Sequence, residues 1–214
     1  MIEAVIFDMD GVLVDTEEFI CEAAMKYFEE LGVQVKAEDF LAFVGMGENR
    51  YIGGVAEKYG LPIDIVQAKK RTYEIYDLIV RGRIDPLDGV MDFLARCKRL
   101  GIKTAVATSA DRTKMEINLR EMGLTEASFN ACVNGLEVER KKPHPDIFLF
   151  AAQKIEAQPE RCLVVEDAIS GVAAAKAAGM KCLALMTSFS AEQLAAADWI
   201  SHTLADAPRE ATEW

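Results

Sequence analysis

Short apolar runs that alternate with amphipathic segments constrain the fold of this chain more than any other feature. The first run, residues 4–7 (AVIF), contains no polar residue, as expected for a strand buried on both faces of a sheet. Comparable runs occur at residues 104–107, 131–134, 162–165 and 181–185. Segments with helical periodicity accompany them at residues 89–100, 112–122, 145–156 and 168–178. The alternation predicts an α/β fold with a parallel sheet flanked by helices.

The stretch from residue 16 to residue 86 differs, because it has helical periodicity and no convincing strand. Helices are predicted there at residues 17–31, 38–44, 48–59 and 63–80. We therefore expect a core formed by residues 1–15 and 87–214, with a small helical cap domain, residues 16–86, inserted after the first strand. Parallel sheets bind ligands beyond the carboxyl ends of their strands, so this insert would lie over the site.

Charge and cysteine usage exclude several classes of function. The 214 residues carry 24 Lys and Arg against 35 Asp and Glu, a net charge of −11. That field disfavours nonspecific binding to nucleic acid or to an anionic membrane, so we expect neither partner. Five cysteines lie far apart without a CxxC motif, which indicates reduced thiols. With no signal peptide and no apolar run long enough for a membrane span, we expect a soluble, cytoplasmic protein, and a monomer.

Histidine is too scarce for several kinds of catalytic site. The chain has two histidines, His144 and His202, which excludes HExxH and multi-histidine zinc sites by counting. No GxSxG elbow is present either. Both histidines are predicted to lie on the surface or to cap helices. If the protein is an enzyme, carboxylates are expected to perform its chemistry.

Residues suited to phosphate chemistry follow several of the predicted strands, and one more lies in a loop. They are Asp8 and Asp10, Thr108 and Ser109, Glu166 and Asp167, and the loop residue Lys142. Carboxylates from two strand ends would meet at one edge of the sheet, and hard oxygen ligands of this kind suit Mg²⁺. The cation would also offset the repulsion within the acidic cluster. A hydroxyl pair ahead of a helix and a fixed lysine charge complete a predicted phosphoryl-transfer centre.

Each of these elements also has an ordinary structural explanation when taken alone. A DxD motif is commonly solvated surface, a Thr-Ser pair or an acidic pair before a helix commonly caps it, and a Lys-x-Pro segment is commonly a loop. Their occurrence in one order, at the ends of apolar runs, favours the catalytic interpretation. The glycine-containing segment 45–50 (GMGENR) lacks the third glycine of a dinucleotide fingerprint and follows a predicted helix, so we do not assign it to a cofactor.

Four segments of the sequence resemble the signature motifs of a known family. They are FDMDGVLVDT (7–16), ATSA (107–110), KKPHPDIF (141–148) and VVEDAISGVAAAKAAG (164–179). These are similar to the motifs of the haloacid dehalogenase superfamily, and most of all to its β-phosphoglucomutase-like phosphatase branch. The resemblance spans nearly the whole chain. It implies a Rossmann-like core with a helical cap after the first strand, and a Mg²⁺-dependent phosphatase or phosphomutase.

The resemblance also implies catalytic and metal-binding roles. Asp8 would be the nucleophile that forms an aspartyl-phosphate, and Asp10 would be the general acid that later acts as a base. The implied Mg²⁺ ligands are Asp8, the backbone carbonyl of Asp10, Asp167 and, directly or through water, Glu166.

A second set of residues would bind the phosphoryl group. Thr108, Ser109 and Lys142 have this role by resemblance. Gly11 would form a tight turn whose backbone amides face the phosphate. Asp15 is expected to be a structural hydrogen-bonding residue and not a catalytic one.

The substrate is less constrained than the chemistry. Asp10 argues for phosphoryl transfer against carbon–halogen hydrolysis, because dehalogenases of this superfamily lack that residue. Ile20 stands where phosphoglucomutases of this type have a cap histidine. Glu48 would repel a second phosphate, although Arg50 is a candidate to compensate. We therefore favour a phosphatase of a small phosphorylated metabolite, such as a sugar phosphate, over a β-phosphoglucomutase-type mutase.

Other classes of protein fit less well. A response-regulator receiver carries its phosphorylated aspartate on a middle strand, whereas the DxD motif here follows the first. A degenerate, non-catalytic hydrolase would be expected to lack a motif residue, and none is missing. Candidates for substrate contact within the cap are Glu17, Gly45, Gly47, Glu48, Asn49 and Arg50.

Overall fold

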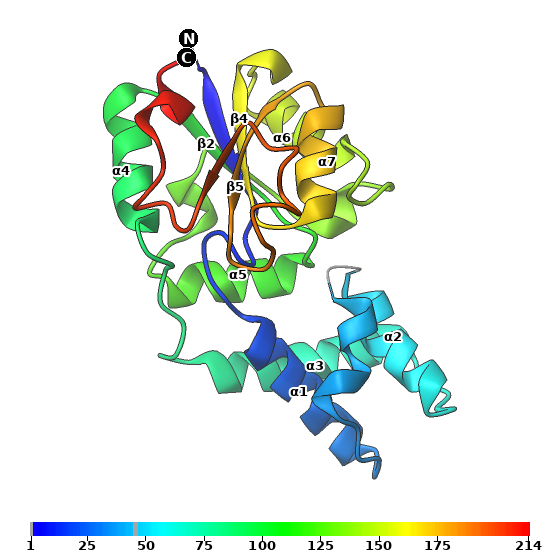
Figure 1. The fold of residues 1–214 in the computed structure, drawn as a ribbon. Helices are drawn as coiled ribbons and strands as arrows, with labels where there is room; N and C mark the ends of the chain where they lie inside the picture. Colours follow the sequence, from blue (N-terminus) through cyan, green and yellow to red (C-terminus); the bar gives the residue numbers. More distant parts are fainter. Residues whose placement is uncertain (1, 45–46) are drawn as a thin grey trace.

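A computed structural model describes residues 2–44 and 47–214, and its centre is a six-stranded parallel sheet (Figure 1). The strand order is β3-β2-β1-β4-β5-β6, so β1 is central. The strands are β1 (Ala4–Phe7), β2 (Lys103–Ala107), β3 (Ala131–Val133), β4 (Cys162–Glu166), β5 (Lys181–Leu185) and β6 (Trp199–Ser201). This confirms the predicted α/β fold with a parallel, Rossmann-like sheet.

Helices cover both faces of the sheet, so every side chain of β1 is buried. Val5 and Phe7 belong to one hydrophobic cluster, which includes residues of α4 (Val90–Leu100) and α5 (Arg112–Glu121). Ala4 and Ile6 belong to a second cluster with residues of α6 (Asp146–Lys154) and α7 (Ile169–Ala177). Side chains of a strand alternate between its two faces, which is why a continuous apolar run predicts burial on both.

The helices α1 (Glu17–Glu30), α2 (Glu48–Lys58) and α3 (Ile65–Val80) form a group that we call the helical segment, residues 17–80. This group lies beyond the carboxyl ends of the strands (Figure 1). The helix α3 begins at Ile65, two residues after the predicted start, because the Asp64 side chain caps it by accepting hydrogen bonds from the amides of Val66 and Gln67. The first hydrophobic cluster continues from the sheet into this segment and includes Phe28 and Tyr76.

One prediction about secondary structure was wrong, and one strand was missed. Residues 38–44 do not form an α-helix; two 3₁₀ turns, Ala37–Asp39 and Leu41–Phe43, occupy this region. The Asp39 carboxylate accepts a hydrogen bond from the Lys36 amide, and such local side-chain contacts favour turns over helices. The edge strand β6 was not predicted, since its three residues carry little periodicity.

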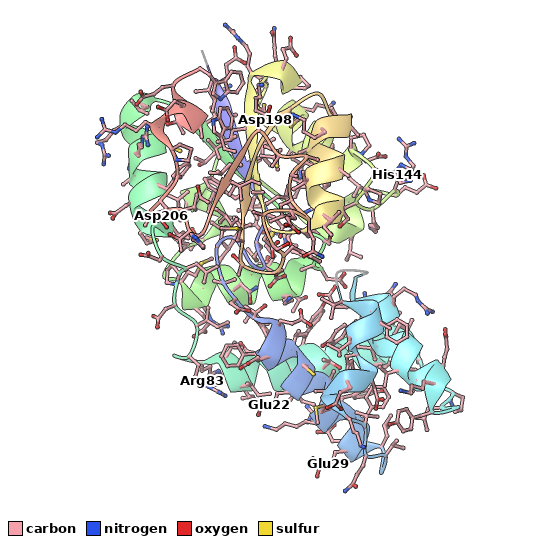
Figure 2. All side chains as sticks on the ribbon, viewed as in Figure 1. Glu22, Glu29, Arg83, His144, Asp198 and Asp206 are labelled. Carbon is pink, nitrogen blue, oxygen red and sulfur yellow. The ribbon has the colours of Figure 1, made fainter. Side chains whose placement is uncertain are left out.

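The histidines and the cysteines lie in the settings that the sequence predicted. His144 and His202 are exposed, and Figure 2 shows His144 on the outside of the molecule. All five cysteines are free thiols, and each is buried or half-buried. Among the described helices, none is both long and apolar enough to cross a lipid bilayer.

Candidate functional site

Carboxylates from two neighbouring strands meet at the carboxyl edge of the sheet. Asp8 directly follows β1, Glu166 ends β4, and Asp167 follows it. One oxygen from each lies within 4.8 Å of the others, and all three residues are buried. The strands β1 and β4 are adjacent and parallel, with Phe7 opposite Val165, so their acidic ends necessarily lie together. Among residues 2–44 and 47–214 this is the one such group that could hold a metal ion.

A single lysine contacts two of these carboxylates. The Lys142 Nζ atom lies 2.6 Å from Asp8 Oδ1 and 2.5 Å from Glu166 Oε1. Burial raises the pKa of Asp8 to about 7, and the neighbouring Glu166 adds to the effect, although Lys142 opposes it. Burial, Glu166 and Asp8 together raise the pKa of Asp167 to about 8. When all three carboxyl groups are ionised, the cluster carries more negative charge than one lysine balances, and that repulsion is part of the reason why these pKa values are raised.

The donor set fits a Mg²⁺ ion. The group consists of carboxylates alone, and buried carboxylate oxygens are the ligands that Mg²⁺ prefers. The repulsion among the ionised carboxylates also favours a cation. One oxygen of Glu166 already has hydrogen-bond partners, because Oε2 accepts from the amides of Asp167 and Ala168 at 2.8 and 2.7 Å. The Ser188 hydroxyl donates to Asp167 Oδ2.

Gly11 lies against the same cluster. Its φ is +79°, and a Cβ at this position would be 2.0 Å from Asp167 Oδ2, so a larger residue would displace that carboxylate. The Gly11 amide donates to the carbonyl of Val14 at 2.7 Å. The tight turn that the sequence predicted is therefore present, while phosphate binding by amides of this turn stays a prediction.

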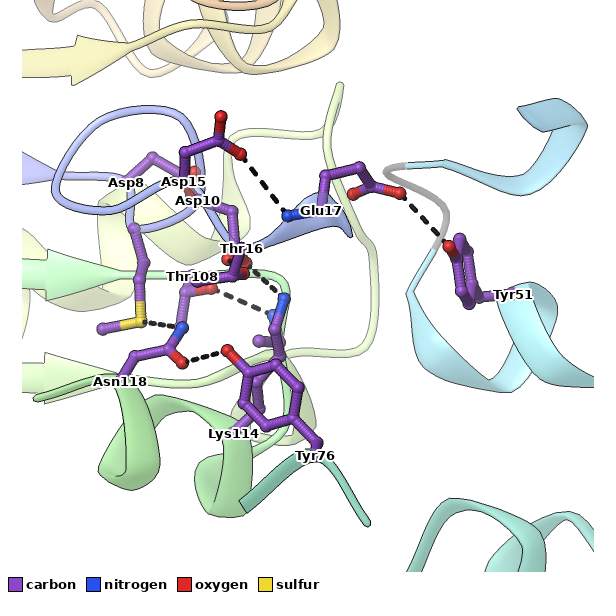
Figure 3. A network of polar contacts seen from close by, with 12 residues as sticks. Asp8, Asp10, Asp15, Thr16, Glu17, Tyr51, Tyr76, Thr108, Lys114 and Asn118 are labelled. Atoms are coloured by element: carbon purple, nitrogen blue, oxygen red, sulfur yellow. Dashed lines mark hydrogen bonds and ion pairs between the residues drawn. The ribbon is translucent and has the colours of Figure 1, made fainter. Parts of the chain in front are cut away.

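Asp10 is oriented by two side chains that come from different parts of the chain (Figure 3). The Lys114 Nζ atom, on α5, lies 2.9 Å from Asp10 Oδ2. The Thr16 hydroxyl donates to Asp10 Oδ1. Lys114 is buried, which disfavours its charge, but attraction to Asp10 and Glu48 outweighs burial and raises its pKa. The Asp10 carboxylate is thus paired with Lys114 and Thr16 and is not one of the three carboxylates of the cluster, while metal binding through its backbone carbonyl stays a prediction.

Thr108 and Ser109 follow β2 at the same edge of the sheet. Thr108 is buried, and its hydroxyl accepts a hydrogen bond from the Ala110 amide at 3.0 Å. Its own amide donates to the carbonyl of Val133. Asp111 occupies the N-cap position of α5, but its carboxylate pairs with Lys69 of α3 at 2.5 Å and does not cap the helix.

A cavity of about 70 Å³ lies beside Asp10, between the sheet edge and the helical segment. Its lining residues are Asp10, Glu17, Ile20, Phe43, Gly47, Glu48, Tyr51, Ser109, Ala110 and Lys114. Glu17 also accepts a hydrogen bond from the Tyr51 hydroxyl at 3.3 Å (Figure 3).

The residues of the helical segment that were predicted to contact substrate differ in where they lie. Glu17, Gly47 and Glu48 line the cavity. Asn49 and Arg50 are exposed on α2, and the Arg50 guanidinium lies 3.0 Å from Glu57 Oε1, so our proposal below does not include them. The candidate Gly45 lies outside the described residues.

Two contacts to the site were missed in the sequence. Lys114 gave no signal, because a lysine within a helix is ordinarily exposed. Ser188 lies shortly after β5, so the same strand-end argument that selected Asp8 and Glu166 could have selected it. Asp15 is exposed and accepts a hydrogen bond from the Glu17 amide at 3.4 Å, in agreement with its expected structural role.

Comparison with known proteins identifies the family. Residues 2–179 match the model of the haloacid dehalogenase-like hydrolases. The chain is 43% identical over 192 residues to the protein SUPPRESSOR OF QUENCHING 1, chloroplastic, of Arabidopsis thaliana, covering 88% of this chain but 18% of that protein. It is 37% identical over 188 residues to the phosphorylated carbohydrates phosphatase of Thermotoga maritima, covering 84% of this chain and 82% of that one.

Solved structures of similar proteins support the same family assignment. The crystal structure of CbbY from Rhodobacter sphaeroides in complex with phosphate has a TM-score of 0.87 and 30% sequence identity, and the alignment covers 96% of each chain. Another structure of CbbY holds xylulose 1,5-bisphosphate. The family and the enzyme class predicted from the motifs are thereby confirmed. The chain belongs to the haloacid dehalogenase-like hydrolase family, and its class is that of a phosphoric monoester hydrolase.

Proposed function

We propose that this protein is a Mg²⁺-dependent phosphatase that hydrolyses a small phosphorylated metabolite through a phosphoryl group carried on Asp8. The observation that supports this most strongly is the shared lysine contact. Lys142 Nζ lies within 2.6 Å of both Asp8 and Glu166, beside Asp167, although the four residues come from three separate segments. In this proposal the sheet is the catalytic core, and residues 16–86 form a cap over it.

In the first half-reaction, Asp8 is the nucleophile. A carboxylate oxygen of Asp8 attacks phosphorus as the bond from phosphorus to the leaving oxygen breaks, and the product is an aspartyl-phosphate and an alcohol. Lys142 holds positive charge beside both Asp8 and the incoming phosphoryl oxygens. A Mg²⁺ ion held by Asp8, Asp167 and the Asp10 carbonyl, with Glu166 as a direct or water-mediated ligand, would neutralise charge on the phosphoryl group. Thr108 and Ser109 are proposed to bind its remaining oxygens.

Asp10 moves the protons. It donates a proton to the leaving oxygen in the first half-reaction. In the second, its carboxylate accepts a proton from the water that attacks phosphorus, which releases inorganic phosphate and regenerates Asp8. Lys114 and Thr16 hold the Asp10 carboxyl in the position from which it serves both steps.

The names of the relatives support the substrate class. One is named a phosphorylated carbohydrates phosphatase, and another a validoxylamine A 7′-phosphate phosphatase. We therefore propose a phosphorylated sugar or a similar small ester as the substrate. A phosphomutase is the alternative. Phosphorus NMR with β-glucose 1-phosphate separates the two, because a mutase forms glucose 6-phosphate whereas a phosphatase forms inorganic phosphate.

The proposal is tested with the purified chain, Mg²⁺ and a panel of phosphate esters that includes p-nitrophenyl phosphate. Phosphate release should require Mg²⁺ and should vanish in Asp8→Asn. The matched control is Asp15→Asn, the same substitution at an exposed aspartate seven positions further along the chain, which should retain activity. No release from any ester, or full activity in Asp8→Asn, would contradict the proposal.

A further inference from the structure

We propose that the enzyme selects phosphate monoesters whose leaving group carries hydrogen-bond donors and no second anionic group. This inference rests on the proposed function, because the cavity beside Asp10 is where the leaving group would lie. It narrows the substrate to neutral or amino-bearing alcohols and disfavours bisphosphates.

The charges around that cavity do not suit a second phosphate. Three lining residues are acidic, namely Asp10, Glu17 and Glu48, and Lys114 is the one basic lining residue among the described parts of the chain. Lys114 Nζ is already paired with Asp10 Oδ2 at 2.9 Å. A second phosphate in this space would therefore meet three carboxyl groups that share a single lysine, and like charges repel strongly at close range.

Glu48 gives a second and independent indication. The residue is 8% exposed, and its Oε2 has no hydrogen-bond partner among the described residues. The buried Tyr73 hydroxyl has none either, although it lies close enough to Glu48 for the two side chains to interact. Buried polar atoms of this kind ordinarily have partners, and an unpaired one costs stability. An ionised Glu48 accepts hydrogen bonds, so a hydroxyl or an amine of the leaving group would satisfy it, whereas an ionised phosphate has no hydrogen to donate.

Two basic side chains near the cavity form ion pairs with other residues. The Arg50 guanidinium pairs with Glu57 on the exposed side of α2 and lies over the ring of Phe43. Lys69 pairs with Asp111 at 2.5 Å. Neither residue lines the cavity.

A longer leaving group would also meet acidic side chains. A larger cavity of about 800 Å³ shares Glu17 and Tyr51 with the small one. Glu22 and Glu29 line it along α1 (Figure 2), together with Glu17 and Glu18. These four glutamates outnumber its two lysines, Lys26 and Lys36, and Lys26 pairs with Glu22 at 2.7 Å. The acidic character therefore continues away from the catalytic carboxylates.

The test compares kcat/KM for matched esters on the Mg²⁺-loaded enzyme. Xylulose 5-phosphate should be hydrolysed at least about tenfold more efficiently than xylulose 1,5-bisphosphate, a factor that corresponds to about 1.4 kcal/mol. A comparison of glucose 6-phosphate with glucosamine 6-phosphate then distinguishes hydroxyl from amine donors, and preference for either supports the proposal.

Glu48→Gln keeps the shape of the side chain and removes its charge. The ratio of kcat/KM for xylulose 5-phosphate to kcat/KM for xylulose 1,5-bisphosphate should therefore fall several-fold. Glu57→Gln is the matched control on the same helix, because Glu57 is exposed and pairs with Arg50 outside the cavity. It should leave the ratio unchanged. Glu17→Gln, on a different helix, repeats the test if Glu48→Gln does not fold.

Two results would overturn the inference while leaving the phosphatase function intact. One is a wild-type enzyme that hydrolyses the bisphosphate as efficiently as the monophosphate. The other is a ratio that neither Glu48→Gln nor Glu17→Gln changes. Failure to hydrolyse any ester would instead contradict the proposed function itself.

Discussion

Gly171 shows how single atoms define the acidic cluster. It lies in the first turn of α7, and a Cβ at this position would lie 1.7 Å from Glu166 Oε1. Glycine within a helix costs roughly 0.5–1 kcal/mol of stability relative to alanine. Close approach to Glu166, and not helix propensity, is therefore what requires glycine at this position.

Gly171→Ala should displace Glu166 and lower kcat at least about tenfold, since misplacing a catalytic group by an ångström has effects of this order or larger. Steady-state kinetics over a range of Mg²⁺ concentrations measures this. Gly53→Ala in α2 is the control, because its Cβ would meet only Ile65 Cδ1 at 3.7 Å, and it should keep full activity. Wild-type activity and Mg²⁺ response in Gly171→Ala would contradict this view of Glu166.

The Lys114–Asp10 contact predicts a dependence on the leaving group. Asp10→Asn should impair hydrolysis of an alkyl phosphate more than the first half-reaction with p-nitrophenyl phosphate, because a good leaving group needs little protonation. Lys114→Met should follow the same pattern with a smaller loss, since Lys114 only positions Asp10. Burst kinetics with both esters tests this, and equal losses for the two esters would show that Lys114 has a general structural role.

Residues next to strand ends could be predicted from sequence, whereas residues brought in by tertiary packing could not. Asp8 and Asp167 follow apolar runs, so their meeting follows from strand order alone. Lys114 is 104 positions from Asp10, and its helix has no feature that marks a buried lysine. Glu48 was predicted as a candidate for substrate contact and lines the cavity, but its burial and unpaired oxygen could be found only in the structure.

At the scale of elements, α3 and α5 connect the helical segment to the sheet. The Tyr76 hydroxyl, on α3, donates to Asn118 Oδ1 on α5 at 2.6 Å, and both residues are buried. Asn118 in turn donates to the sulfur of Met9, which lies between Asp8 and Asp10 (Figure 3). Lys69 and Asp111 form a second link between the same two helices.

Tyr76→Phe should lower the free energy of unfolding by about 1–3 kcal/mol, because it leaves a buried amide oxygen of Asn118 without a donor. Urea denaturation followed by circular dichroism measures this. Tyr59→Phe is the matched control: its hydroxyl bonds to Asp39 at 2.6 Å in an exposed setting, and the change should stay within about 0.5 kcal/mol. An equal effect of both substitutions would argue against a special role for the α3–α5 contact.

Long, strongly periodic elements were predicted to within a few residues, and short ones were not. The helix predicted at 63–80 is Ile65–Val80, and the strand predicted at 162–165 is Cys162–Glu166. The 3₁₀ turns at residues 37–43 depend on local side-chain contacts, and β6 depends on pairing with β5. Hydrophobic periodicity carries no information about either kind of contact.

For the whole molecule, the buried acidic cluster predicts that Mg²⁺ stabilises the fold. A ligand at one hundred times its dissociation constant adds about 2.7 kcal/mol of stability. For a chain of this size the midpoint of thermal unfolding should rise by roughly 5–10 °C. Calorimetry with EDTA and with saturating Mg²⁺ measures the shift.

Asp167→Asn provides the control, because it removes one charge from the cluster without changing its shape. Its metal-free form should be at least as stable as the metal-free wild type, since repulsion among the buried carboxylates is relieved. Mg²⁺ should then raise its melting temperature little. A full Mg²⁺ shift in this variant would mean that the ion binds elsewhere.

The central claim is that Asp8 carries the phosphoryl group during turnover, and acid quenching tests it most directly. Asp10→Asn is mixed with Mg²⁺ and p-nitrophenyl phosphate, whose good leaving group permits the first half-reaction while the base for the second is missing. We predict that mass spectrometry of the quenched protein finds one phosphoryl group on Asp8. A phosphoryl group on any other residue would contradict the account.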